Sequence, residues 1–461
     1  MNRKPAVALM VAGACVMALF WVCAVGCPAA FDYAEGDTAV WIWLLRHGRD
    51  LYRPLGELPL LSSNYPPLQL HLVAWLAPSD AAILPVGRLV SLAGFLLAMA
   101  MIGVSVAGAT RSRRTGVLAA LLFAATCQPG YHAVVCRADS LALGLGAVGV
   151  TLAARRVRGW PMLAAIAFTA SLLAKHNLIV LPGGVILWAL WRETRNGIVL
   201  ALTTALLLGA SIFALHLFEP LVMWSIAGWK LITFLRYLGE AVAPSMFGVA
   251  IAIWAWRHRD RFSPEARQVL GPWGAVLALG ALWWLALGRT GSSANYLLEF
   301  FAALVVVVAV AVSAGAPVRL LYAHLALALA ETTVWVIVLL AFALPASKLE
   351  LSGARAALAG VSGTVFAEQA WLPALGAGKE PIAIPYLATQ LSYAGRWDAA
   401  PLVRAFEHGE VARVLLDFTL EEPAANNFLH RDRFTAAELD ALRAHYRLVS
   451  QSGALHVYAP R

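Results

Sequence analysis

Charged residues are scarce in this chain: Asp, Glu, Lys and Arg make up 13% of its 461 residues, whereas 61% are hydrophobic. That balance and the mean hydropathy of +0.72 lie far outside the range of soluble globular domains. The composition therefore predicts an integral membrane protein. It also argues against nucleic acid as the partner behind the net charge of +9, because the basic residues stand in short clusters between apolar runs.

Cysteine motifs and phosphate-binding loops are missing as well. The five cysteines show no CxxC or zinc-like spacing, so we expect them to be small apolar fillers in helices. Cys127 and Cys136 flank one outer loop, and the sequence leaves open whether they pair. GAGKE at residues 376 to 380 lacks the GxxxxGK[ST] spacing of a P-loop.

Apolar runs of roughly 15 to 25 residues recur through the first three quarters of the chain, at the length that a helix needs to cross a bilayer. By that criterion we expect about eleven spans. Basic clusters fall on every second loop, at Arg3 and Lys4, 111 to 114, 155 to 158, 192 to 195, 257 to 267 and Arg319. The positive-inside rule makes that side cytoplasmic. It predicts a multi-pass protein of a bacterial-type inner membrane, with the N-terminus inside and the C-terminal tail outside.

The first apolar run, about residues 6 to 26, also resembles a secretory signal, because Arg3 and Lys4 precede it and CPAA follows it. The run is long for the apolar region of a signal, which favours an uncleaved first span. We therefore assign residues 1–346 to a transmembrane domain with a structured first outer loop at residues 28–82.

From residue 347 the composition becomes mixed polar and apolar. GTVFAEQ, EPIAIPY, ARVLLDF and GALHVYAPR predict short strands, and DAAPLVRAFEHG and TAAELDALRAHYRL predict helices. Thr435 and Glu438 form a capping-box pattern at the start of the second helix. Residues 347–461 thus predict a small α/β domain, and the whole chain is expected to be an all-α polytopic membrane protein with this tail outside.

Three acids stand in FDYAEGDTAVW at residues 31 to 41, directly after the first span. Membrane-adjacent acids are costly and scarce, so their presence indicates a function. An amphipathic pattern predicts an interfacial helix that starts after Asp37. Asp37 then fits the N-cap position equally well, whereas Glu35 lies outside the predicted helix and has no such structural role.

The later outer loops contain polar residues that allow both a structural and a functional interpretation. Arg137 and Asp139 open a span, where interfacial anchoring and helix capping explain them without a ligand. Lys175 and His176 run against the positive-inside bias, which favours a site for an anionic group. GRTGSSANYLLEF adds Arg289, Asn295, Tyr296 and Glu299. Glu299 would fall in the first turn of the next span, where the helix dipole favours an acid, so a structural role explains part of its position.

Acids in the first outer loop and cations in the later ones suit glycosyl transfer from a polyprenyl phosphate. A carboxylate can take the proton of an acceptor hydroxyl, and Arg or Lys can stabilise the departing phosphate. The long hydrocarbon chain of such a donor explains why the chemistry lies beside membrane helices.

The chain resembles the GT-C glycosyltransferases, which include protein O-mannosyltransferases and lipid A aminoarabinose transferases. The segments that carry the resemblance are YAEG at 33 to 36, GRDLYRPLGELPLLSSNYPPLQLHLVAWL at 48 to 76, RADSLALGLG at 137 to 146, AKHN at 174 to 177 and NYLLEF at 295 to 300. The resemblance implies a GT-C fold and an inverting transferase that uses a lipid-linked sugar.

The resemblance also implies roles for residues. Many relatives carry an Asp-Glu pair in the first loop, but here Ala34 precedes Glu35, so either Glu35 or Asp37 is expected as the base, with Glu35 favoured. Asp139 would help to arrange the site. The predicted contacts to lipid phosphate and sugar are Arg137, Lys175, His176, Arg289, Asn295, Tyr296 and Tyr65 of the YPP element. The three acids permit a divalent metal, Mg or Mn, without requiring one, and no other cofactor is expected.

Two further classes stay open. A transporter or flippase of lipid-linked saccharide would carry ionisable residues near the membrane midplane or in repeated halves. The sequence shows no convincing repeat, and most of its polar residues cluster at one face of the membrane. The exceptions are His216, His324 and Glu331. A degenerate relative with an assembly role would explain the broken acid pair. The sequence names neither the sugar nor the acceptor, which is a glycan, lipid or protein hydroxyl.

Overall fold

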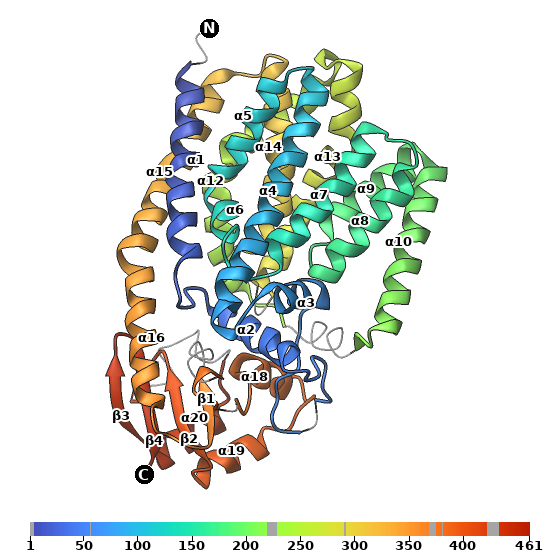
Figure 1. Ribbon diagram of the computed structural model, residues 1–461. Helices are drawn as coiled ribbons and strands as arrows, with labels where there is room; N and C mark the ends of the chain where they lie inside the picture. The colour runs from blue at the N-terminus through green and yellow to red at the C-terminus, as the bar shows by residue number, and fades with distance from the viewer. Residues whose placement is uncertain are drawn as a thin grey trace.

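Long apolar helices stand side by side in the first three quarters of the molecule, and a small sheet with its own helices covers one end of them (Figure 1). The computed structural model describes residues 4–55, 57–218, 228–289, 292–367, 375–379, 381–421 and 433–461. The start of the first helix and the C-terminal tail lie at opposite ends of the molecule. The predicted basic position Arg3, most of the FEPLVMWSIAGWK loop and Glu380 lie outside the described residues.

Eleven named helices form the bundle in the described part of the chain. They are α1 (Lys4–Val25), α4 (Ile83–Thr110), α5 (Arg113–Ala124), α7 (Asp139–Arg155), α8 (Trp160–Ala174), α9 (Val180–Arg192), α10 (Thr194–Ala214), α12 (Leu231–Arg257), α13 (Pro264–Trp283), α14 (Leu298–Ser313) and α15 (Val318–Val338). Shorter elements near the tail are α2 (Tyr33–Arg46), α3 (Pro67–Leu76), α6 (Cys127–His132), η3 (Trp284–Gly288) and η4 (Ala294–Leu297).

Only some of these helices satisfy a length and composition test for spanning a bilayer. Among the described residues six do so, or seven if the bent pair Leu231–Val242 and Pro244–Arg257 is one span. Helices α8 and α9 are apolar but shorter. The predicted count of eleven spans is therefore not confirmed, although the membrane character is.

The apolar core gathers around α14. In its most apolar stretch 83% of the residues are buried, against 17% in α10, so α14 lies at the centre and α10 at the periphery. Helices α4 and α7 approach closely, because a Cβ on Gly94 would meet Leu141 Cα at 2.4 Å and one on Gly144 would meet Gly94 O at 2.3 Å. This packing fixes the start of α7, where Asp139 lies.

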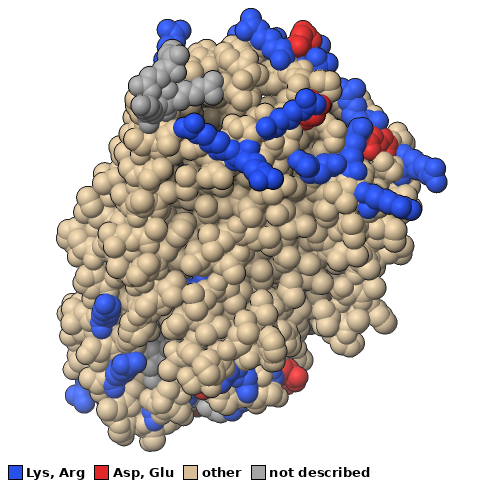
Figure 2. Space-filling view, turned by 45° about the horizontal axis from the view of Figure 1, so that its top comes forward, with Lys and Arg blue, Asp and Glu red and all other residues tan. Residues whose placement is uncertain are grey.

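Exposed arginines gather at the end of the bundle where α1 begins, above a wide band without charges (Figure 2). They follow α4, α7 and α9 and flank α13 and α15, as the clusters in the sequence predict. Two of them pair across loops, Arg111 with Glu265 and Arg156 with Glu193. The charge distribution agrees with the predicted topology, while the cytoplasmic orientation of this end stays a prediction.

The tail contains a four-stranded sheet in the order β1-β2-β4-β3. Strand β1 (Thr364–Ala367) is parallel to β2 (Val411–Leu416), whereas β4 (Leu455–Pro460) is antiparallel to both β2 and β3 (Tyr446–Ser452). Helices α18 (Pro385–Tyr393), α19 (Ala400–Glu407) and α20 (Ala436–His445) complete it. The predicted capping box of Thr435 and Glu438 is present.

Two of the predicted tail elements are wrong. EPIAIPY is not a strand: it makes single bridges from Pro381 to Val365 and from Ala383 to Leu60, and α18 then begins at Pro385. The predicted last helix ends at His445, and the following Tyr446 begins β3 instead. Tyr and the β-branched or aliphatic residues after it favour pairing with β4 over another helical turn.

The first outer loop and the tail share one hydrophobic core, which includes Trp41 and Leu61 of the loop and Phe366 and Leu391 of the tail. Backbone hydrogen bonds join Leu60 N to Ile382 O at 2.9 Å and Ile384 N to Leu60 O at 3.1 Å. Helix α15 also continues through a π-helical turn into α16 (Leu344–Leu358), so the predicted boundary after residue 346 falls inside a helical run. Both connections hold the tail against the end of the bundle.

Candidate active site

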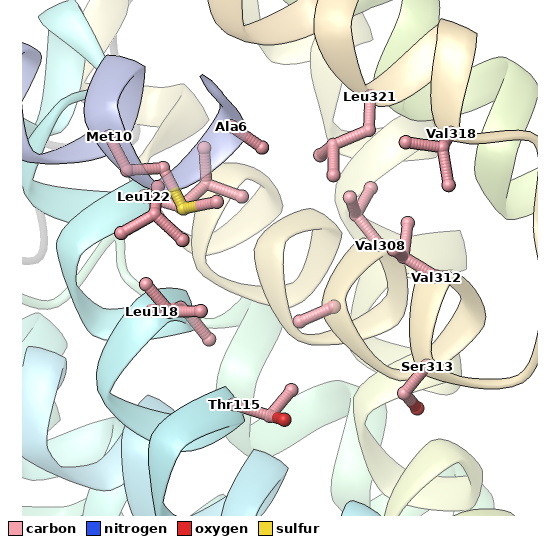
Figure 3. Close-up of a pocket in the computed structure, with 13 residues that line it drawn as sticks. Ala6, Met10, Thr115, Leu118, Leu122, Val308, Val312, Ser313, Val318 and Leu321 are labelled. Atoms are coloured by element: carbon pink, nitrogen blue, oxygen red, sulfur yellow. The ribbon is translucent and has the colours of Figure 1, made fainter. Parts of the chain in front are cut away.

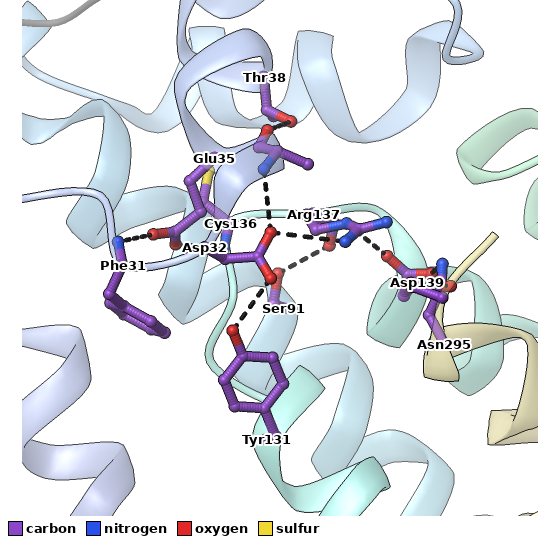
Figure 4. A network of polar contacts seen from close by, with 12 residues as sticks. Phe31, Asp32, Glu35, Thr38, Ser91, Tyr131, Cys136, Arg137, Asp139 and Asn295 are labelled. Carbon is purple, nitrogen blue, oxygen red and sulfur yellow. Dashed lines mark hydrogen bonds and ion pairs between the residues drawn. The ribbon is translucent and has the colours of Figure 1, made fainter. Parts of the chain in front are cut away.

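Four segments that are far apart in the sequence meet at the end of the bundle that faces the tail. They contribute Asp32 from the first loop, Arg137 and Asp139 from the start of α7, Lys175 from the end of α8 and Asn295 from η4. A continuous series of ion pairs and hydrogen bonds joins them, and Figure 4 shows most of it. We call these five residues the polar cluster.

Asp139 lies at the centre of the polar cluster and is fully buried. Its Oδ1 accepts hydrogen bonds from Lys175 Nζ at 2.6 Å and from Asn295 Nδ2 at 2.6 Å, and its Oδ2 lies 3.2 Å from Arg137 Nε. The N-cap of α7 is Ala138, without a side-chain cap. The capping interpretation of Asp139 is therefore wrong: its carboxylate holds other side chains.

Arg137 links Asp139 to the first loop. Its Nη1 lies 3.4 Å from Asp32 Oδ1 and its Nη2 donates to the Tyr65 hydroxyl at 3.4 Å. Burial opposes the charge, but Tyr65, Asp139 and Asp32 hold the pKa of Arg137 well above its ordinary value. The side chain keeps 12% of its surface exposed.

Asp32 is the N-cap of α2, because its Oδ1 accepts a hydrogen bond from Ala34 N at 3.0 Å. Its Oδ2 accepts one from the Tyr131 hydroxyl at 3.0 Å. The prediction that Asp37 caps this helix is wrong, since α2 begins at Tyr33, four residues earlier. Asp37 lies in the second turn and is only 6% exposed, whereas the side chain of Asp32 is 15% exposed.

Glu35 lies in the first turn of α2, not outside the helix as predicted, and is fully buried. It forms a two-bond ion pair with Arg88, from Nε to Oε1 at 2.8 Å and from Nη2 to Oε2 at 2.7 Å. Cys136 N also donates to Oε1 at 2.7 Å and Phe31 N to Oε2 at 3.1 Å. With both oxygens doubly engaged, Glu35 has no free lone pair for a substrate proton.

Arg88 is the residue that sequence reasoning missed. Besides Glu35 it donates to Ala24 O at 2.9 Å and to Ala29 O at 2.6 Å, and it contacts Cys27 O. The signal was present, because a single arginine in the apolar run ILPVGRLVS needs a buried partner. The pair fixes the first turn of α2 and the end of α1, and through them the position of Asp32.

Tyr65 of the first loop packs against Lys175 of the polar cluster. The Lys175 ammonium lies 4.8 Å from the centre of the Tyr65 ring, in cation–π geometry, and the lysine is 1% exposed. The other edge of Tyr65 meets Trp41 of α2 at a ring distance of 5.3 Å. The YPP element therefore contributes an aromatic contact between α2 and the polar cluster.

The remaining predicted residues lie beside the polar cluster. Burial and the positive charges of Lys175 and Arg289 lower the pKa of His176 to about 3, so its ring is neutral at physiological pH. Tyr296 stacks on Trp283 at a ring distance of 6.4 Å. Arg289 ends η3 and is partly exposed. The structure thus brings all the predicted contact residues to one end of the bundle.

Glu299 and the cysteines belong to the scaffold. The Glu299 carboxylate accepts a hydrogen bond from Leu181 N at 2.7 Å, so it caps the start of α9 from the first turn of α14. Cys127 and Cys136 are both buried free thiols. The alternative left open by the sequence, a disulfide between them, is not formed.

The donor set does not fit a divalent metal. Arg137 lies between the carboxylates of Asp32 and Asp139, and Arg88 occupies both oxygens of Glu35. A metal ion needs carboxylates converging on one point, and the positions that it would take are filled by guanidinium groups. Among the described residues no three His, Cys, Asp or Glu side chains converge in that way.

The bundle, the covering tail and a charged cluster between them define a polytopic membrane protein whose fold is similar to that of solved ArnT structures. The whole chain superposes on ArnT from Cupriavidus metallidurans bound to undecaprenyl phosphate, with a TM-score of 0.60, 13% identity and 98% of that chain covered. ArnT from the same organism in the apo state gives a TM-score of 0.59 at 14% identity, again with 98% covered. Neither a protein-family model nor a curated protein matches the sequence.

Proposed function

We propose that the protein is a membrane glycosyltransferase that moves a sugar from a polyprenyl-phosphate donor to a hydroxyl acceptor. The observation that carries this proposal is the polar cluster itself, in which the carboxylate of Asp32 lies 3.4 Å from Arg137 and the cations Arg137 and Lys175 flank Asp139. The fold is shared with an ArnT that is bound to undecaprenyl phosphate, and this likeness supports a polyprenyl phosphate as the donor lipid.

Charge favours a phosphate ligand at this site. Arg137, Lys175 and Arg289 supply three cations, and Asp32 and Asp139 supply two carboxylates, so an arriving phosphate meets net positive charge. Burying these charges is costly unless they are paired, and Asp139 provides that pairing in the absence of substrate. The apolar bundle beside the cluster provides the surroundings that a polyprenyl tail needs.

The reaction we propose is a single displacement with inversion. The acceptor oxygen forms a bond to the anomeric carbon while the bond from that carbon to the phosphate oxygen breaks. Asp32 takes the acceptor proton as general base, and Arg137, Lys175 and Arg289 stabilise the negative charge that collects on the departing polyprenyl phosphate. Products are the glycosylated acceptor and the lipid phosphate, with the proton on Asp32.

This assignment moves the base from Glu35 to Asp32. Asp32 retains exposed surface and receives one hydroxyl bond at Oδ2, whereas Glu35 is fully buried and held by Arg88. Glu35 acts instead as a positioning residue, because it fixes the turn that presents Asp32. Asp37, buried in the second turn of α2, is then part of the helix that supports the site.

Turnover by the purified protein tests the proposal. The full-length chain in detergent is given polyprenyl-phosphate sugars labelled in the sugar, together with extracted envelope lipids, glycans and proteins. Transfer of label to one acceptor class supports the proposal and identifies the acceptor. Mass spectrometry of envelope glycans from a deletion strain would name the sugar independently.

A transporter or flippase of lipid-linked saccharides is the second candidate. It predicts ionisable groups along the spans, and α15 does carry a buried His324 and a partly buried Glu331. The ion-paired and fully buried acids of the described residues, however, gather at the tail end of the bundle. Lipid flipping in reconstituted vesicles without any sugar transfer would favour this second candidate and overturn the first.

A further inference from the structure

An apolar groove opens at the other end of the bundle, between the start of α1, α5, the end of α14 and the start of α15 (Figure 3). The residues that line it are Ala6, Val7, Met10, Thr115, Leu118, Ala119, Leu122, Val308, Ala309, Val312, Ser313, Val318 and Leu321. None of them belongs to the candidate active site, which lies at the tail end of the bundle.

The groove follows α5 for about two turns, and its lining is almost entirely apolar. Its wall on α5 runs from Thr115 to Leu122, which corresponds to about 10 Å of helix. The two hydroxyl residues, Thr115 and Ser313, lie together at one side of it in Figure 3. The Ser313 hydroxyl bonds to Val310 O at 2.6 Å, so its polarity is satisfied within α14. A hydrocarbon chain suits this shape better than a polar ligand.

Two arginines are sequence neighbours of residues that line the groove. Arg114 directly precedes Thr115 in the first turn of α5, and Arg319 directly follows Val318 in the first turn of α15; both side chains are exposed. Neither of them, in the part of the chain that the structure describes, makes an ion pair, whereas nearby Arg111 pairs with Glu265. The wall segments 113 to 122 and 308 to 321 contain no Asp or Glu.

The helices that form the groove also carry exposed apolar side chains elsewhere on their surfaces. Val11 of α1 is 43% exposed and Val117 of α5 is 60% exposed, so these helices carry large apolar side chains that a bilayer would cover. A groove between such helices lies within reach of membrane lipids.

We propose that this groove binds an anionic phospholipid of the leaflet at the arginine-rich end, with an acyl chain along α5 and α14 and the phosphate facing Arg114 and Arg319. An apolar slot, and two exposed cations that adjoin its lining residues Thr115 and Val318 in the sequence, match the two parts of such a lipid. The occupant links α1 to α5, α14 and α15, so it is expected to stabilise the bundle. The proposal does not depend on the proposed transfer reaction.

Lipid retention by the intact chain tests the proposal. The full-length protein is reconstituted in nanodiscs of phosphatidylglycerol and phosphatidylcholine in equal amounts, released, and analysed by native mass spectrometry. We expect one phosphatidylglycerol to remain bound, in at least fivefold excess over phosphatidylcholine. The double variant Arg114→Ala/Arg319→Ala should remove that preference, and Ala309→Phe, which fills the groove, should remove the bound lipid altogether.

The matched control is Arg158→Ala/Arg195→Ala, which removes two exposed arginines from the same end of the molecule but away from the groove. It should retain the lipid as the wild type does. Equal retention of the two lipids by the wild type, equal loss in the control, or lipid kept by Ala309→Phe would overturn the proposal.

A measurement on the unaltered chain covers the case in which a variant does not fold. Phosphatidylglycerol with a photoreactive diazirine in its acyl chain is incorporated into vesicles with the wild-type protein and cross-linked by light. Labelled peptides should map to α1, α5, α14 or α15 around the groove. Labelling spread evenly over the lipid-facing helices, including α10, would show that no such site exists.

Discussion

Lys175 Nζ lies 2.6 Å from Asp139 Oδ1, and both side chains are almost completely buried. Asn295 and Arg137 contact the same carboxylate. Three segments of the chain that are far apart in sequence are thus joined at one carboxyl group, so the ion pair holds the site together as well as supplying a cation to it.

Replacing Lys175 by Met should be strongly destabilising. The substitution leaves Asp139 buried with fewer compensating charges, and breaking a buried pair from one side costs about 3–5 kcal/mol. Thermal unfolding of the detergent-solubilised protein measures the loss. The double variant Lys175→Met/Asp139→Asn should be more stable than the sum of the single effects implies, and additive effects would show that the two groups do not interact.

Glu35→Gln should lower the stability of the protein more than its transferase activity. Its bonds to Arg88 are charge-assisted, so the change should cost about 2 kcal/mol of unfolding free energy. At a temperature where the variant is folded, transfer should fall by less than the roughly 100-fold expected for loss of a general base. A stable, fully folded Glu35→Gln protein without activity would return Glu35 to the role of base.

The sequence was sufficient for the class of membrane protein, and it predicted several of the polar residues that the structure brings together. Periodic apolar runs and arginine clusters depend only on the surrounding solvent, so they predicted a membrane bundle with polar chemistry at one end. Lys175 was predicted because a cation there runs against the positive-inside bias, whereas Asn295 and Tyr65 were predicted from the family resemblance.

Assignment of roles needed the structure. The roles of Asp32, Glu35 and Asp37 depend on where α2 begins, and the N-cap lies five residues earlier than predicted, at Asp32 instead of Asp37. The partner of Glu35 is Arg88, 53 residues away, and local sequence gives no such pairing. Likewise, Tyr446 begins a strand because it pairs with Pro460 of β4, and the helical pattern over residues 435 to 448 does not show this pairing.

Arg289→Gln should weaken donor binding without unfolding the protein. The residue is partly exposed at the edge of the polar cluster, and loss of a contact to a charged phosphate costs about 1.5–3 kcal/mol. KM for the lipid donor should therefore rise by roughly tenfold or more, with little change in the thermal midpoint. Arg404→Gln, an exposed arginine on α19, is the control, and an equal rise in KM there would refute a specific role.

Stability of the tail should depend on the ionisation of Glu438. Burial raises the pKa of Glu438 to about 7 in the folded state, although bonds from Thr435 and Thr389 lower it in part. The folded state therefore binds the proton more tightly, so this stability is fully present below about pH 4.5 and is lost as the pH rises through 7.

The wild type should lose about 2–4 kcal/mol relative to Glu438→Gln between pH 4.5 and pH 8. Thermal unfolding at a series of pH values, followed by a tail-specific probe, measures the difference between the two proteins. Parallel curves across that range would show that Glu438 keeps an ordinary pKa.

The central claim is that Asp32 takes the proton of the acceptor, and Asp32→Asn tests it most directly. The amide oxygen of Asn can keep the bond from Ala34 N that caps α2, and its amide nitrogen can donate to the oxygen of the Tyr131 hydroxyl, which also accepts, so the variant should fold with little change in the thermal midpoint. Single-turnover transfer of labelled sugar from the polyprenyl-phosphate donor should fall by about 100-fold or more, while donor binding persists. Transfer at the wild-type rate by folded Asp32→Asn would contradict the account.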